Sequence, residues 1–263
     1  MPSCCSTLRK GVAASVLSLG LVSSSALADE TDAKQILQAM SDYLSGEQSL
    51  SFDYDSMLEI VTTEDQKLGI TASGTVTLTR PDKLRATRQG GFSDIEMVFD
   101  GETFSLLGDH AGIYTQFPAK GSIDELVDLL REEYGRPLPA ADLLAGAPYE
   151  ILMSEVTDVK DMGVGVIGGK VCDHLAFRTP EVDWQIWIAT DGTPHPCRYV
   201  ITTHTLTQGP QYVVDIRDWR DDPEIADESF AFTAPSGATG VEFEEYHKAG
   251  GELPDHYRTG ESK

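Results

Sequence analysis

The sequence contains no asparagine, and it also lacks the short motifs that mark several common enzyme classes. There is no H-E-x-x-H zinc motif, no pair of C-x-x-C motifs and no G-x-S-x-G elbow around a nucleophilic serine. Gly163, Gly165 and Gly168 do satisfy G-x-G-x-x-G, but a dinucleotide loop needs a helix directly after it, and a strand pattern follows here. We therefore interpret these glycines as a hairpin connection, and we expect no catalytic residues, no metal and no cofactor.

Basic residues are scarce, with 20 Lys and Arg against 43 Asp and Glu and a net charge of −23. A field of this sign repels nucleic acid and anionic membrane surfaces, so we expect neither as a partner. Solubility in a salty exterior is the simpler explanation of the charge, and a specific cationic ligand is the alternative.

No apolar run approaches the ~20 residues that a membrane-spanning helix needs. The longest lies between Val12 and Val22, follows Arg9 and Lys10, and is succeeded by Ala26-Leu27-Ala28, which is the order of an export signal. We predict that residues 1–28 are a signal peptide cleaved after Ala28; a membrane anchor is the competing interpretation. The mature protein is then periplasmic or secreted, does not span the membrane, and carries a charge of −25 because the signal holds two basic residues and no acid.

Only two cysteines, Cys172 and Cys197, remain once the signal is removed. An oxidising compartment favours a disulfide between them. They open the first and third strands of a predicted meander, however, and in a flat sheet that places their Cα atoms ~10 Å apart, beyond the ~7 Å limit for a bridge. The loop at residues 190–196 must bend to close this gap, so a disulfide and two free thiols both remain open.

Apolar and polar residues alternate through most of the chain, which is typical of strands with one buried face. The clearest case is residues 170–203, where three alternating runs are separated by short turns. Long strands are expected near residues 52–60 and 68–79. Shorter strands are expected at 83–88, 93–99, 103–107, 113–117, 156–167 and 211–219, with a final one at 230–232.

Helical periodicity replaces this alternation in two places. Residues 31–44 carry one apolar stripe that ends before Gly46, and residues 122–146 begin with a capping box formed by Ser122 and Glu125. Pro137 and Pro139 break the second helix, and a further helix is expected at 148–155. The apolar stripe after the capping box includes Ile123, Leu126, Val127 and Leu130.

Ten or eleven strands with these helices predict an α+β fold. We expect a curled antiparallel sheet, or incomplete β-barrel, with an N-terminal helix and a helical insertion that packs on the concave side as a lid. Residues 29–246 are expected to form one open-barrel domain, and residues 247–263 a polar, disordered tail.

Four segments resemble a family of predicted periplasmic proteins known as domain of unknown function 2092. The resemblance spans residues 33–243 and is most specific around Asp183-Trp184-Gln185-Ile186-Trp187-Ile188. The segments are SGTVTLTRPDKLRATRQGGFSDIEMVFDG, SIDELVDLLREEYG, CDHLAFRTPEVDWQIWIATDGTPHPCRYVITT and SFAFTAPSGA.

The order of elements is also similar to that of the Lol-type lipoprotein carriers and receptors. In that fold an incomplete antiparallel barrel, lidded by helices, holds acyl chains in an apolar cavity. The resemblance implies a fold and a possible ligand class but no established activity. This chain departs from those carriers in its acidity and its longer polar tail.

The leading hypothesis is therefore an exported, non-enzymatic protein that binds a hydrophobic small molecule, a lipid or a lipoprotein in an apolar cavity. The sequence does not indicate an oligomeric state. The side chains expected to line the cavity are Phe52, Tyr54, Leu58, Ile70, Val76, Leu84, Ile95, Met97, Trp184 and Ile186 from the strands, with Ile123, Leu126, Val127 and Leu130 from the lid.

Two alternatives belong to other functional classes. A protein-binding envelope module would use exposed strand edges and an apolar outer patch. A hydrolase of envelope material would need carboxylates such as Asp173 and Asp183 to converge, yet alternation places Asp173 and His174 on opposite faces of one strand. Trp184 and Trp187 are likewise on opposite faces, so one belongs to the core and the other packs under a loop or borders a ligand.

Overall fold

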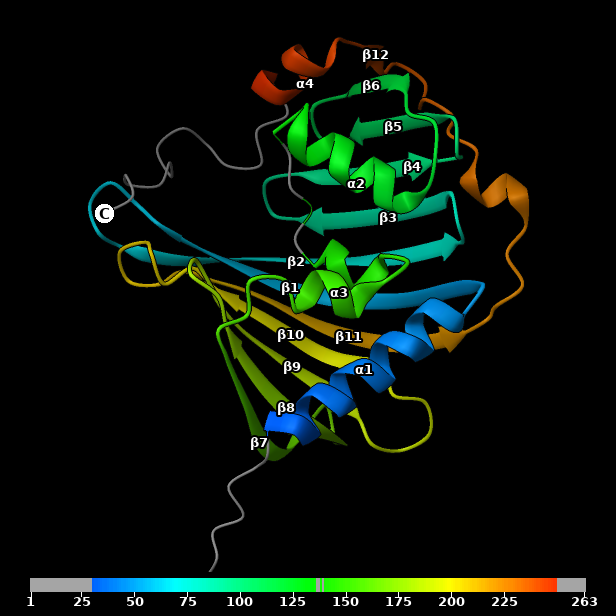
Figure 1. Cartoon of the computed structure of the whole chain (residues 1–263). Helices are drawn as coiled ribbons and strands as arrows, with labels where there is room; N and C mark the ends of the chain where they lie inside the picture. The colour runs from blue at the N-terminus through cyan, green and yellow to red at the C-terminus, as the bar shows by residue number, and fades with distance from the viewer. Residues whose placement is uncertain (1–29, 136–137, 139, 250–263) are drawn as a thin grey trace, which may run out of the picture.

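The computed structural model describes residues 30–135, 138 and 140–249 of the chain. These residues form a curled, twelve-stranded sheet with helices packed against it (Figure 1). The first half contains α1 (Glu30–Gly46), β1 (Ser49–Val61), β2 (Lys67–Thr79), β3 (Lys83–Gly90), β4 (Asp94–Phe99), β5 (Thr103–Gly108), β6 (Ile113–Pro118), α2 (Ile123–Glu132), the 3-10 helix η1 (Ala141–Leu144) and α3 (Pro148–Leu152). The second half contains β7 (Asp158–Ile167), β8 (Lys170–Arg178), β9 (Asp183–Ala189), β10 (Pro196–Thr202), β11 (Gln211–Asp221), the 3-10 helix η2 (Asp227–Phe230), β12 (Thr239–Gly240) and α4 (Phe243–Ala249).

The sheet consists of two up-and-down meanders joined side by side through one end strand of each. Strands β1 to β6 form one meander and β7 to β11 the other, and β1 pairs with β11 in antiparallel register. The two-residue strand β12 adds to β6 in parallel. Strands β7 and β12 remain as the two edges, so the barrel does not close. The predicted fold class is confirmed, with twelve strands in place of ten or eleven.

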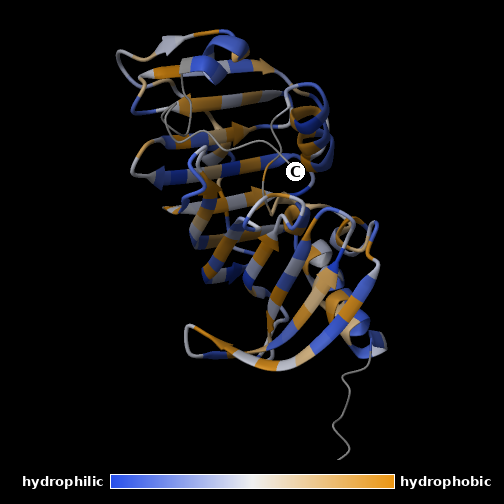
Figure 2. Cartoon of the chain, turned by 90° about the vertical axis from the view of Figure 1, so that its left-hand side faces the viewer, coloured by the Kyte–Doolittle hydropathy of each residue, from blue (hydrophilic) through white to orange (hydrophobic). Residues whose placement is uncertain are grey.

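The alternation in the sequence accounts for the faces of the strands, and Figure 2 shows hydrophobic and hydrophilic residues alternating along them. Leu175, Ile186 and Tyr199 lie opposite one another on β8, β9 and β10, and all three are buried. They share one core with Leu37 of α1. The meander predicted at residues 170–203 is therefore confirmed.

The helices cover one face of the sheet, as Figure 1 shows for α1, α2 and α3. Helix α1 buries Ala33, Leu37, Met40 and Leu44 along one stripe. Helix α2 begins with the expected capping box, in which the Ser122 hydroxyl accepts from the Glu125 amide and the Glu125 carboxylate accepts from the Ser122 amide.

The hairpin between β7 and β8 turns at Gly168 and Gly169, which both have positive φ. Two such residues suit the tight turns that join antiparallel strands. Because β8 follows directly, the glycine-rich run opens no helix, and Gly168 belongs to the hairpin connection as predicted. The prediction is wrong for Gly163 and Gly165, which lie within β7, where Gly165 pairs with Cys172.

One prediction about the C-terminal part is wrong. Residues 230–232 do not form a strand, because Phe230 is the last residue of η2. The Ser229 amide donates to the Ala226 carbonyl and the Ala231 amide to the Glu228 carbonyl. These local hydrogen bonds take the place of hydrogen bonds to a neighbouring strand. The first residues of the expected tail, His247 and Lys248, lie in α4, which packs the buried Tyr246 against Gly108 of β5. The predicted signal peptide and residues 250–263 lie outside the described residues.

Candidate functional site

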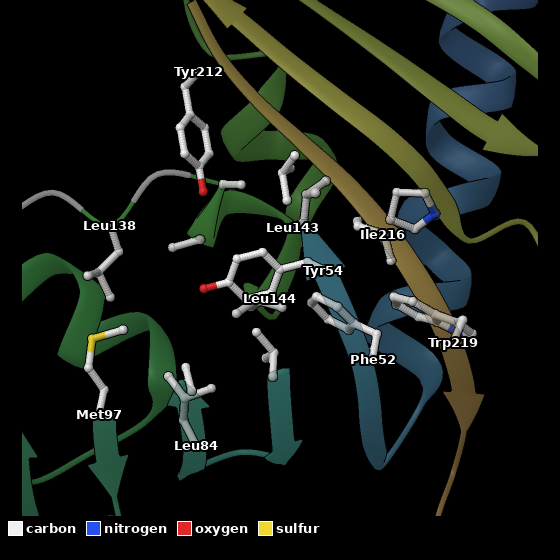
Figure 3. Close-up of a pocket in the computed structure, with 16 residues that line it drawn as sticks. Phe52, Tyr54, Leu84, Met97, Leu138, Leu143, Leu144, Tyr212, Ile216 and Trp219 are labelled. Atoms are coloured by element: carbon white, nitrogen blue, oxygen red, sulfur yellow. The ribbon is translucent and has the colours of Figure 1, made fainter. Parts of the chain in front are cut away.

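An apolar cavity of about 110 Å³ lies between the sheet and the segment that follows α2 (Figure 3). All sixteen lining residues are uncharged, although 24% of the whole chain is charged. From the sheet and the start of β10 come Phe52, Tyr54, Val76, Leu84, Ala86, Met97, Pro196, Tyr212, Val214, Ile216 and Trp219; from the segment after α2 come Leu138, Ala140, Ala141, Leu143 and Leu144. We call the latter five residues together with Asp142 the lid segment.

A stack of aromatic rings forms one end of the cavity wall. The Phe52 and Trp219 rings are parallel with centroids 5.2 Å apart, and His195 stacks on Trp219 at 5.4 Å. The Trp219 Nε1 donates to the Asp221 carboxylate at 2.7 Å and to the Tyr43 hydroxyl at 2.9 Å, and that hydroxyl itself bonds Asp221. Because its polar edge is held outside the cavity, Trp219 presents hydrocarbon to the interior.

A close approach of two strands positions Tyr54. A Cβ atom at Gly74 of β2 would lie 1.9 Å from the Thr87 carbonyl oxygen and 2.7 Å from the Tyr54 hydroxyl. Glycine is therefore required at this position. The Tyr54 hydroxyl donates to the same Thr87 carbonyl at 2.9 Å, which fixes its ring against the cavity.

Arg80 holds the C-terminal end of the lid segment. Its guanidinium donates from Nη1 to the Leu144 carbonyl at 2.8 Å and from Nη2 to the Leu44 carbonyl at the end of α1 at 3.2 Å. The next anchor is Asp124 of α2, whose carboxylate accepts from the Gly146 amide at 3.0 and 3.1 Å. Burial lowers the pKa of Arg80, and the nearby Asp124 opposes this shift.

One carboxyl group of the lid segment is itself shielded from water. Burial raises the pKa of Asp142, against a smaller opposite effect of Arg131. Burial also raises the pKa of Tyr199, and Asp142 adds to that shift. The charged form of Asp142 is therefore disfavoured while the lid segment is packed against the sheet.

The structure brings five of the side chains expected at a cavity wall to this cavity, namely Phe52, Tyr54, Val76, Leu84 and Met97. The others lie elsewhere: Ile95, Ile123, Leu126, Leu130, Trp184 and Ile186 are buried in the main core, and Leu58, Ile70 and Val127 are partly buried. The wall residues contributed by β11 were detectable from the alternation of Tyr212, Val214 and Ile216. The lid segment gave no comparable periodic signal.

The residues weighed for acid–base chemistry do not converge. Asp173 lies opposite Ile188 at one end of the β8–β9 pair, while Asp183 lies opposite Arg178 at the other end and is bound to it bidentately at 2.6 and 2.7 Å. The two carboxylates also project from opposite faces of the pair. His174 is engaged on the outer face by Gln185 at 2.9 Å and by stacking on Trp187, whereas Trp184 is buried against Phe177. Among the described residues, no three His, Cys, Asp or Glu side chains are grouped to hold a metal ion.

Cys172 and Cys197 are both buried and form one small cluster with Ala189. Burial, followed by the neighbouring Cys172, raises the pKa of Cys197 to about 12. Across the described part of the chain, no helix has the length and apolar character needed to cross a membrane.

Comparison with known proteins gives a family match and several similarities of fold. A family model described as "Predicted periplasmic protein (DUF2092)" matches residues 33–244. No curated protein matches the chain.

Among solved structures, the lipoprotein LppX of Mycobacterium tuberculosis is 18% identical, with a TM-score of 0.46 over 75% of this chain and 99% of its own. LprF of Mycobacterium bovis is 13% identical, with a TM-score of 0.44 over 80% and 99%. A LolA superfamily protein of Nitrosomonas europaea is 11% identical, with a TM-score of 0.34 over 76% and 97%. These similarities concern the fold alone.

Proposed function

This chain belongs to the DUF2092 family of predicted periplasmic proteins, and from this premise we propose that it binds a hydrophobic ligand, such as an acyl chain, a lipid or a lipoprotein anchor. The observation that supports the proposal is the cavity whose sixteen lining side chains are all uncharged in a strongly acidic chain. In such a cavity each buried methylene of a ligand contributes about 0.8 kcal/mol. Export by a cleaved signal at residues 1–28 and binding without catalysis are parts of the same proposal.

The size of the cavity sets a requirement on the mechanism. Small-molecule sites usually measure roughly 300–1,000 Å³, and this cavity measures about 110 Å³. Loading therefore requires the wall to move. The lid segment is the element to move, because five of its residues cover the cavity, while the opposite wall is built from hydrogen-bonded strands.

Fluorescence quenching by a brominated fatty acid tests the proposal. Of the three tryptophans, only Trp219 lines the cavity. We expect 9,10-dibromostearate to quench the fluorescence of the mature protein, and stearate to compete without quenching. The Trp219→Phe variant should lose most of the quenching. The matched Trp187→Phe variant, altered on the outer face, should keep it. Absence of quenching, or equal quenching in the two variants, would contradict binding in this cavity.

A second candidate, a protein-binding module, is favoured by one surface. The hairpin of β7 and β8 exposes Met162, Val164, Val166 and Val171 to 54%, 68%, 65% and 48%, and residues 162–172 include no acid. Within the described residues β7 pairs only with β8, so one edge of this strand is open to an added strand.

Site-specific photo-crosslinking separates this candidate from the first. A photoreactive amino acid at position 164 should give one discrete protein adduct in the intact envelope, and the same group at Phe92, another exposed apolar position, should give none. An adduct of twice the chain's mass would identify a second copy as the partner. Identical patterns at both positions would count against a docking edge.

A further inference from the structure

Cys172 and Cys197 lie on strands that are not neighbours, since β9 separates β8 from β10. A flat sheet would hold their Cα atoms ~10 Å apart. In this structure the two side chains nevertheless belong to one cluster with Ala189, and they are exposed to only 0% and 2%. Ile167 and Trp187 cover the cluster.

A bulge in β10 explains how the two side chains meet. Pro196 lies opposite Ile188 and Arg198 lies opposite Trp187, so Cys197 is an extra residue with no partner of its own on β9. A bulge of this kind bends the strand and redirects the side chain of the extra residue. Cys172 lies directly opposite Ala189, whose amide donates to the His195 carbonyl at 2.9 Å, so the hairpin between β9 and β10 closes beside Cys172.

We propose that Cys172 and Cys197 are joined by a disulfide in the exported protein. The inference rests on the periplasmic location given in the proposed function, and it does not depend on a hydrophobic ligand. Two adjacent thiols in an oxidising compartment are the usual substrates for such a bond.

The oxidation proceeds by thiol–disulfide exchange with a disulfide-bearing oxidant of the envelope. One thiolate attacks the oxidant's disulfide to give a mixed disulfide, and the second thiolate displaces the oxidant from it. One S–S bond forms in this protein and one breaks in the oxidant, which leaves with two electrons and two protons as a dithiol. Because burial raises the pKa of Cys197, exchange has to occur before the cluster closes during folding, or through transient opening.

The bond would stiffen one end of the apolar cavity. Pro196 precedes Cys197 and lines the cavity, while His195 stacks on Trp219, which also lines it. A disulfide at Cys197 therefore ties this part of the wall to β8. The tie joins β8 to β10 and includes no residue of the lid segment, so it limits movement of the strands.

Alkylation and intact mass of the full-length protein, exported in its own host, test the bond. The protein is denatured in acid and treated with iodoacetamide before and after reduction. After signal cleavage we expect no adduct without reductant and two adducts with it, because Cys4 and Cys5 leave with the signal. The Cys172→Ser and Cys197→Ser variants should each carry one adduct without reductant. Two adducts on the unreduced wild type from a verified periplasmic fraction would overturn the inference.

A second measurement keeps the test independent of location. A form comprising residues 29–263, purified with both thiols reduced, is treated with oxidised glutathione. We expect it to lose both alkylation sites by forming an intramolecular bond, and its Tm to rise, with no change in a Cys172→Ser/Cys197→Ser variant. Persistent thiols, or mixed disulfides with glutathione that never close, would show that the geometry does not permit the bond. A negative result here leaves the ligand proposal intact.

Discussion

Leucine at position 86 would fill the cavity from the wall that the strands form, opposite the lid segment. Ala86 is on β3, is 7% exposed and lines the cavity. Each Å³ of empty cavity lowers the free energy of unfolding by about 24 cal/mol, so complete filling of the 110 Å³ would raise that free energy by about 2.6 kcal/mol. Three added carbons at about 0.8 kcal/mol each give a similar limit. Lost rotamer freedom of about 0.5–1 kcal/mol and imperfect fit reduce the gain, and we expect Ala86→Leu to stabilise the protein by about 1 kcal/mol.

The same substitution should abolish ligand binding, because it occupies the space that the ligand needs. Urea unfolding measures the first effect, and the second is measured by quenching of Trp219 with 9,10-dibromostearate, for which we expect at least tenfold weaker binding. Thermal unfolding should shift upward by about 2–4 °C. Ala176→Leu on the outer face of β8 is the control and should leave binding unchanged. An Ala86→Leu protein that is less stable and still binds the probe normally would refute the assignment of this cavity as the ligand site.

Three further substitutions test how the cavity is built and closed. Arg80→Ala leaves the Leu144 and Leu44 carbonyls without their donors, so we expect the free energy of unfolding in urea to fall by about 2–4 kcal/mol. Hydrogen exchange should also become faster in residues 140–146. Unchanged exchange in these residues would argue against Arg80 as an anchor of the lid segment. Burial raises the pKa of Asp142, so the folded state holds that proton more tightly than the unfolded state. Stability should therefore fall as the pH rises above the ordinary value of 3.8, and Asp142→Asn should remove this dependence between pH 4 and 7. Gly74→Ala should cost at least about 2 kcal/mol because the new methyl group meets the Thr87 carbonyl, whereas Gly46→Ala, with open space around it, should cost nothing measurable.

The architecture was largely predictable because it depends on local periodicity. Alternation at residues 170–203 specified three strands, and a one-residue slip would expose Leu175 and Ile186. The Ser122 capping box specified the start of α2 in the same local way. The prediction failed at residues 230–232, where two phenylalanines around an alanine looked like a strand but the preceding Asp227 and Glu228 form a turn.

The candidate site was predictable only in part, because it combines segments that are far apart in the chain. Tyr54 was predictable as inward-facing, but the hydrogen bond from its hydroxyl to Thr87, across Gly74, depends on the approach of β2 to β3. The lid segment lies between Pro137 and Pro148 and has no hydrophobic periodicity. Its position depends on Arg80, whose two acceptor carbonyls come from separate elements. A hydrogen bond between such distant segments produces no periodic pattern in the sequence.

By itself, the sequence determined the excess of acidic residues and an open antiparallel sheet covered by helices on one face, since each follows from composition or from a repeat of two or 3.6 residues. Only the tertiary structure decided which apolar residues surround a cavity and which fill the core, because both sets have the same chemistry and differ only in what packs opposite them. The same holds for Cys172 and Cys197, which the ideal sheet keeps apart and a single bulge in β10 brings together.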